Sequence, residues 1–314
     1  MTKFTLLAGA CIASFAAMTG AALAEYPEKP VTFIVPWPPG DLEDVLTRMI
    51  AEEFQKQTGA PAAVVNRPGG GGIVGALEVA QAPADGYKIG SFVMGIPTVK
   101  TMGADAQIQR DTFEPIGIFL TYPFLIAAAK DAPYNTLQEM ADYSKTNNVR
   151  LGHFGYGLEP TLLTVLGTQN LGGKFGAEAA FDALDCSTLA NGDADVINTT
   201  AQLVLPCLSE IKVLATITGE RMSITPEAPT LGELVPALDS TLWNGLFVPK
   251  GTPQDVKDKI AAAAQAVVGS AAAQDIAKTT GAQVYWMDAA ASADRINLDY
   301  DQLKSVREQL GVTE

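Results

Sequence analysis

The chain has 314 residues, three cysteines, one histidine and a formal net charge of −14. This acidic balance excludes the basic faces by which proteins bind nucleic acid or anionic membrane surfaces, so we expect neither as a partner. A single histidine argues against a catalytic triad or a histidine metal site, because both need several converging groups. We therefore expect no enzymatic activity, no metal and no cofactor.

Residues 1–24 have the pattern of a secretory signal peptide. Lys3 is a short basic region, an apolar stretch rich in small residues follows, and the tripeptide at 22–24 fits a small-x-small cleavage site. We expect cleavage after Ala24 and export to the periplasm. In that oxidising compartment we expect Cys186 and Cys207 to form a disulfide, with two buried free thiols as the alternative.

The rest of the chain alternates strand and helix patterns, which predicts an α/β fold with mostly parallel strands. An apolar strand at 31–36 precedes a helix at 44–59, in which Leu46, Ile50 and Phe54 share one face and which Gly59 ends. We expect further strands at 62–66, 123–130, 194–198 and 211–217, a turn and a strand over 85–93, and a strand that runs into a loop over 149–157. We expect a glycine loop followed by a helix over 67–82, and further helices at 136–147, 163–172, 180–192, 199–211 and 252–281.

The stretch PWPPGDLEDV at 36–45 closes the first strand and opens the first helix. A helix start attracts anions because its first N–H groups are unpaired, yet Asp41, Glu43 and Asp44 crowd this one. The acids can point inward and repel an anion, or both Asp41 and Glu43 can face solvent at the rim. Asp41 can also cap its own helix, with Glu43 in solvent.

A similar stretch, GHFGYGLEP at 152–160, also joins a strand end to a glycine loop and a helix start. Two such loops facing each other across a cleft would hold a small molecule by its two ends. His153 is a ligand contact or a surface residue. The glycine run at 69–72 lacks the ending of a phosphate loop, so we expect it to allow a close backbone approach.

The chain resembles the periplasmic solute-binding receptors of tripartite tricarboxylate transporters, the Bug-type family. The resemblance is carried by YPEKPVTFIVPWPPG, DVLTRMIAEEF, VVNRPGGGGIVGA, DGYKIG, GDADV, ERMSITPEAPTLGEL and WNGLFVPKGTP, in this order. It covers the whole length that follows the signal peptide.

The resemblance implies two α/β domains in a Venus flytrap architecture, with crossing strands near 120–126 and 243–248 at the hinge. Domain 1 would comprise residues 25–123 and 243–314, and domain 2 residues 124–242. The implied function is capture of a small organic molecule, most often an organic acid, and its delivery to membrane permease subunits. We expect a monomer. A receptor that feeds a signalling partner, or a hydrolase using His153, are the rival functions.

The resemblance also implies that the ligand lies between three loops. The expected ligand-binding residues are Trp37, Pro38, Pro39, Gly40, Asp41, Leu42, Asp44, Met94, Gly95, His153, Phe154, Gly155, Tyr156, Gly157, Leu158 and Asn198.

Both ligand loops depart from the family pattern. The first usually reads Gly-Gly-x-Thr-Asp, but residues 40–44 here read GDLED, and the second usually carries small hydroxyl residues, which aromatic and acidic residues replace here. A carboxylate ligand is therefore one alternative, and a neutral, zwitterionic or amine-bearing ligand is the other. A carboxylate bridged by a metal is a third. We expect Phe181 to lie in the core.

Overall fold

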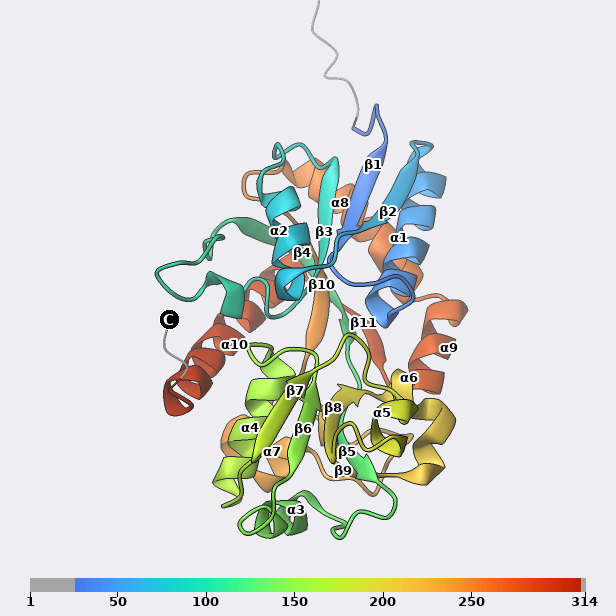
Figure 1. The fold of residues 1–314 in the computed structure, drawn as a ribbon. Coiled ribbons are helices and arrows are strands. Elements are labelled where there is room, and N and C mark those ends of the chain that lie inside the picture. Colours follow the sequence, from blue (N-terminus) through green and yellow to red (C-terminus); the bar gives the residue numbers. More distant parts are fainter. Residues whose placement is uncertain (1–25, 312–314) are drawn as a thin grey trace, which may run out of the picture.

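The computed structural model describes residues 26–311, which form two α/β lobes (Figure 1). The expected signal peptide and its cleavage site after Ala24 lie outside the described residues. Within residues 26–311, no single helix has the length and apolar composition needed to cross a membrane. Helices α8 (Gln254–Val268) and α9 (Ala271–Thr280) meet that criterion only together, as a pair bent by 62°.

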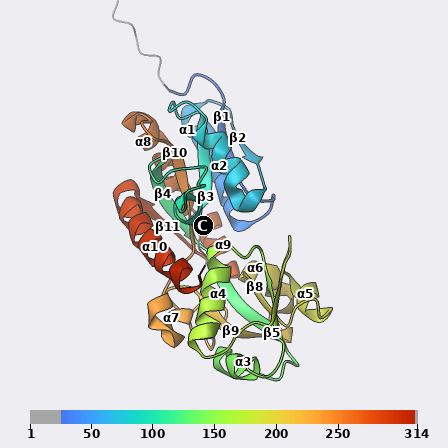
Figure 2. The same ribbon diagram turned by 60° about the vertical axis from the view of Figure 1, so that its left-hand side comes forward.

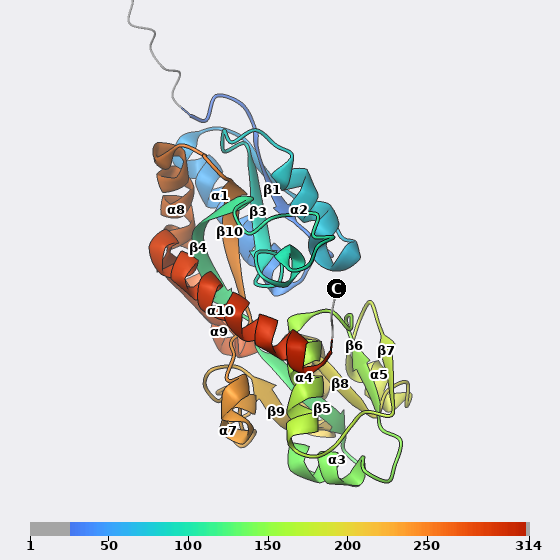
Figure 3. The same cartoon turned by 90° about the vertical axis from the view of Figure 1, so that its left-hand side faces the viewer.

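The first lobe is built on a six-stranded sheet with the order β11-β4-β10-β3-β1-β2. Its strands are β1 (Val31–Val35), β2 (Ala62–Asn66), β3 (Lys88–Val93), β4 (Phe113–Thr121), β10 (Trp243–Pro249) and β11 (Gln283–Asp288). Its helices are α1 (Leu42–Thr58), α2 (Ile73–Ala80), α8, α9 and α10 (Ala289–Gln309), with 3-10 turns η1 (Gly70–Gly72) and η2 (Val99–Thr101). Figure 3 shows α2 on the opposite side of this sheet from α8.

The second lobe is built on a five-stranded sheet with the order β7-β6-β8-β5-β9. Its strands are β5 (Phe124–Ala129), β6 (Arg150–His153), β7 (Ala177–Ala180), β8 (Val196–Thr200) and β9 (Ile211–Ile217). Its helices are α3 (Leu137–Tyr143), α4 (Glu159–Asn170), α5 (Cys186–Ala190), α6 (Ala201–Val204) and α7 (Leu231–Leu234), with 3-10 turns η3 (Leu205–Glu210) and η4 (Pro236–Leu238).

The prediction of mostly parallel strands is wrong, because both sheets are mixed. Strands β1–β3 pair in parallel, but β10 runs antiparallel to both β3 and β4, and β11 runs antiparallel to β4. In the second sheet β6 is parallel to β7 and β8, whereas β5 is antiparallel to β8 and β9. The pairing direction depends on how the chain returns from one lobe to the other, which a local pattern does not encode.

Local signals predicted the first helix well. Helix α1 ends at Gly59, whose φ of 76° is the left-handed conformation that glycine adopts without strain. The predicted helices at 180–192 and 199–211 are wrong in extent. β-Branched Thr199 and Thr200 continue strand β8, and only the short helices α5 and α6 with the turn η3 remain.

The two lobes are joined where the chain crosses between the sheets. Strand β4 ends at Thr121 and β5 begins at Phe124, and the Tyr122 N–H donates to the carbonyl of Leu242, just before β10, at 2.8 Å. The two crossings are therefore tied to each other. Helix α10 forms a third link, since it runs from the first lobe to α4 of the second (Figure 2).

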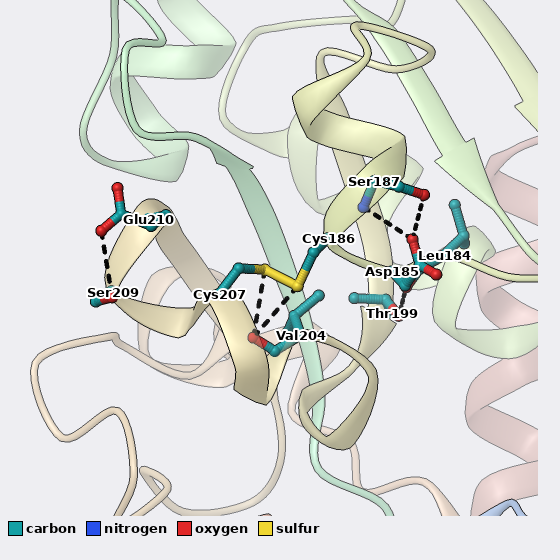
Figure 4. The surroundings of a disulfide bond; sticks show 9 residues. All are labelled: Leu184, Asp185, Cys186, Ser187, Thr199, Val204, Cys207, Ser209 and Glu210. Atoms are coloured by element: carbon teal, nitrogen blue, oxygen red, sulfur yellow. Dashed lines mark hydrogen bonds between the residues drawn. A yellow bond between two sulfur atoms is a disulfide. The ribbon is translucent and has the colours of Figure 1, made fainter.

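A disulfide joins Cys186, at the start of α5, to Cys207 in η3, with a Cα–Cα distance of 5.9 Å (Figure 4). The bond ties two short helical segments that follow different strands of the second lobe. Phe181 packs against the apolar cluster of this region, in line with its expected place in the core.

Replacing both cysteines by serine should lower the free energy of unfolding by about 3 kcal/mol, because the cross-link closes a loop of 21 residues. Urea unfolding of the C186S/C207S variant and of the oxidised protein measures this difference. Equal midpoints for the two proteins would show that the bond does not form in the folded protein.

Candidate functional site

Two loops, one from each lobe, end in helix starts that face the same interlobe region. Residues 36–41 connect β1 to α1, and residues 154–158 connect β6 to α4. Across the lobes, a Cβ atom at Gly95 would collide with the Glu159 carboxyl, and a Cβ atom at Gly71 would lie 3.4 Å from Leu158 Cδ2. A side chain at position 95 would therefore displace the Glu159 carboxyl, which packs there from the second lobe.

The expected ligand-binding residues differ in how accessible they are. Pro38, Pro39, Gly40, Tyr156 and Gly157 are exposed. Trp37, Asp41, Phe154, Gly155 and Leu158 are partly buried, and Leu42, Asp44, Met94, Gly95, His153 and Asn198 are buried. The exposed group lies at the tips of the two loops, and the buried group lies at the strand ends and helix starts beneath them.

The acidic residues of the first loop take three different environments. Asp41 is the N-cap residue of α1, but its side chain makes no capping hydrogen bond, so the prediction that it turns onto its own helix is wrong. Burial, together with the neighbouring Asp44, raises its pKa. The expectation that Glu43 faces solvent is also wrong, because its side chain is only 3% exposed.

Asp44 is a structural anchor of the first loop. Its carboxylate accepts hydrogen bonds from the Gly40 N–H at 2.9 Å, from Asn66 at 2.8 Å and from Arg48 at 2.9 Å. Burial alone would raise the pKa of Asp44, but these donors outweigh it and lower the pKa. The carboxylate of Asp44 is therefore used in hydrogen bonds within the protein, and these bonds fix the conformation of the loop.

Glu43 lies beside a chain of buried hydrogen bonds at the base of the first lobe. Its neighbour in that chain is the Tyr122 hydroxyl. The Tyr122 hydroxyl donates to Asn244 Oδ1 at 3.3 Å, and Asn244 Nδ2 donates to Ser91 Oγ at 2.7 Å. The nearby Tyr122 hydroxyl acts to lower the pKa of Glu43, but the effect of burial is larger. Burial, with Asp41 nearby, raises the pKa of Glu43 to about 8.

Glu159 is the corresponding buried acid of the second lobe. It is the first residue of α4 and is 4% exposed. Burial raises its pKa to about 7, although the charge of Lys100 from the first lobe opposes the shift. In residues 26–311, neither Glu43 nor Glu159 has a lysine or arginine nitrogen within 4 Å.

Three buried side chains near the start of α4 keep polar atoms without a partner in the described structure: His153 Nδ1, Thr161 Oγ1 and Asn198 Oδ1. His153 is buried and its Nε2 bonds to Glu178, so the expectation of a surface residue is wrong. Asn198 donates from Nδ2 to the Pro160 carbonyl at 3.2 Å and to Thr164 Oγ1 at 2.7 Å. Sequence reasoning missed Thr161, for which the only local signal is its place in the first turn of α4.

Aromatic side chains border the second loop. Phe154 packs edge-on against Phe124 with ring centroids 6.4 Å apart, so it is anchored to the lobe. The Tyr156 ring contacts the His153 ring edge-on at 6.2 Å and is 40% exposed. Tyr156 is therefore free to cover a molecule lying on the loop.

Two cavities lie beside these loops. One of about 460 Å³ lies at the hinge and is lined in part by Thr121, Gly219, Tyr285 and Arg295. Another of about 360 Å³ is lined mainly by first-lobe residues such as Lys100 and Asp105, and reaches Gly157. Residues 26–311 contain no cluster of three or more histidine, cysteine or acidic side chains arranged to hold a metal ion.

The family model described as "Tripartite tricarboxylate transporter family receptor" matches residues 46–312 of the chain. Among curated proteins, a UPF0065 protein of Bordetella pertussis is 31% identical over 274 residues, which cover 84% of each chain.

Solved structures share the fold over nearly their full length. The periplasmic binding protein BugD has a TM-score of 0.79 and 27% identity, with 92% of this chain and 99% of that chain covered. The Rhodopseudomonas palustris protein Rpa4515, solved with adipate, has a TM-score of 0.80. The match covers 91% of this chain and 99% of Rpa4515. Its identity of 23% supports a common fold alone.

The buried acid of α1 makes stability fall as the pH rises. The pKa of Glu43 is raised from an ordinary 4.5 to about 8 on folding, so the folded protein binds the extra proton between these values. Its stabilising contribution is complete below about pH 4.5 and is lost as the pH rises through about 8. The variant E43Q keeps the hydrogen-bond donor without a charge, so its melting temperature should fall less than that of the wild type between pH 6 and pH 9.

Thermal unfolding of wild type and E43Q across this pH range measures the effect, and E52Q, on the exposed side of the same helix, is the matched control. Parallel pH profiles for wild type and E43Q would contradict the raised pKa of Glu43.

Proposed function

Because the chain belongs to the receptors of the tripartite tricarboxylate transporter family, we propose that it captures a small organic solute between its two lobes and delivers it to the membrane permease of such a transporter. Receptors of this family are periplasmic binding proteins, not enzymes. The proposal includes removal of the signal peptide after Ala24, which would release the mature receptor into the periplasm.

One observation supports the location of the ligand site most directly. Loops that end strands of different sheets, after β1, β3 and β6, approach each other closely enough for Glu159 to pack against Gly95. In α/β proteins, ligands bind beyond the carboxyl ends of strands and preferentially where domains meet. A molecule held by both lobes would stabilise their closed arrangement, because separation of the lobes would break half of its contacts.

Two ligand classes fit this function. The family resemblance implies a carboxylate-bearing solute, and adipate in the structure of Rpa4515 is an example from a protein of the same fold. The buried acids Glu43 and Glu159 favour the other class, a neutral, zwitterionic or amine-bearing solute. Uptake of candidate solutes by cells with and without the gene for this receptor, in the presence of the permease, tests delivery.

Tyr156→Ala should weaken ligand binding about tenfold, or about 1.4 kcal/mol, because the exposed ring would no longer cover the bound molecule. The free energy of unfolding should change by less than about 0.5 kcal/mol, since the side chain is exposed. The first step is a thermal-shift screen of carboxylates, amines and neutral compounds, in which a ligand at 100 times its Kd stabilises by about 2.7 kcal/mol. Calorimetric titration of the best compound then compares the variants.

Tyr143→Ala is the matched control, because Tyr143 is similarly exposed at 37% but lies on α3, at the far end of the second lobe (Figure 1). Unchanged affinity in the Tyr156 variant would remove this loop from the ligand site.

A further inference from the structure

At both helix starts that face the interlobe region, the chain itself places a buried glutamate. Glu43 lies in the first turn of α1 and is 3% exposed, and Glu159 lies in the first turn of α4 and is 4% exposed. The N–H of Gly40, in the loop before α1, is taken by Asp44 at 2.9 Å. A ligand carboxylate arriving here would find this donor already used and carboxyl groups close by, and like charges repel each other.

Near α4, the side chain of Asn198 keeps an unmatched acceptor, and the unmatched hydroxyl of Thr161 can donate or accept. The amide of Asn198 has a fixed orientation, because the Pro160 carbonyl can only accept and so must face Nδ2. Its Oδ1 is left without a donor, although the residue is fully buried. His153 Nε2 bonds to the Glu178 carboxylate, and its Nδ1 is buried without a partner.

Taken together, a buried acceptor without a donor and a buried carboxyl without a close cation favour a ligand that supplies hydrogen-bond donors and positive charge. Glu159 packs against Gly95 of the other lobe, so separation of the lobes would uncover it. We propose that the ligand presents a protonated amine to Glu159 and to Oδ1 of Asn198, whose Nδ2 bonds to the carbonyl of the next residue, Pro160. This inference rests on the proposed function and names the ligand class of the same site.

The pH dependence of binding follows with a definite sign. A protonated amine binds the ionised form of Glu159, so affinity should rise about tenfold from pH 6 to pH 8 and level off above it, given a pKa of about 7. A carboxylate ligand would show the opposite trend, since it needs Glu159 protonated. The other charged group facing Glu159 is Lys100, from η2, and lysine side chains stay charged over this range.

The sharpest test uses compounds that share one carbon chain and differ only in the charge of their ends. Adipate, hexamethylenediamine, ε-aminocaproate and hexanediol carry two negative, two positive, one of each and no charge, and the same sets with shorter and longer chains cover ligand length. Calorimetric titration at pH 6, 7 and 8 should give binding for compounds with an amine end, tightening with pH, and none for the diacids.

The variant E159Q keeps the shape of the side chain and removes its charge. It should bind the amine at least tenfold more weakly at pH 8 and lose most of the pH dependence, while its circular dichroism spectrum stays that of the wild type. E227Q, an exposed glutamate of the same lobe, is the matched control and should behave as the wild type. A pH dependence that persists unchanged in E159Q would overturn the role of Glu159.

The outcomes separate the two proposals. Binding of diacids alone would overturn the amine inference and leave the receptor function intact. Binding of hexanediol as tightly as the diamine would also overturn it, because charge would then play no part. Absence of binding by every compound at every chain length would overturn both the ligand class and the proposed capture of small solutes at this site.

Discussion

The arrangement of the whole molecule depends on the burial of strand β10. All seven of its residues are buried, and it fills the position between β3 and β4 in the first sheet. The chain reaches this position only after it has built the second lobe, so the first sheet cannot be completed until the chain returns. The first lobe therefore contains segments from both sides of the second, and two crossings join the lobes at one edge.

This connection determines how the lobes can move. The crossings are tied by the hydrogen bond from Tyr122 to Leu242, and Trp243 at the start of β10 is held by Asp299 of α10 at 2.6 Å. Rotation about such a short double connection opens or closes the opposite side, where the loops after β1 and β6 lie. Separating the lobes also separates Gly95 from Glu159, so the state of the cleft and the hydration of this carboxyl change together.

The chemistry of the cleft reflects which charges have partners. The charge of Asp44 is neutralised by Arg48, and its carboxylate also accepts hydrogen bonds from Gly40 and Asn66, so it stabilises the loop. Glu43 and Glu159 have no such cation, and each lies in the first turn of a helix. A helix start stabilises a nearby negative charge by about 0.3–1 kcal/mol, which is less than the cost of burying a carboxylate. The pKa values of these two acids rise accordingly.

Local sequence patterns determined the strand at 31–35, the helix that Gly59 ends and the two glycine loops, because apolar periodicity and backbone preferences act over a few neighbouring residues. Tertiary structure decided the direction of strand pairing, the shortness of α5 and α6, and the burial of Glu43, Glu159 and His153. The local sequence around an acidic residue is the same whether its side chain faces solvent or packs against Gly95. The partners Tyr122, Asn244 and Gly95 are distant in sequence, and only folding brings them to these side chains.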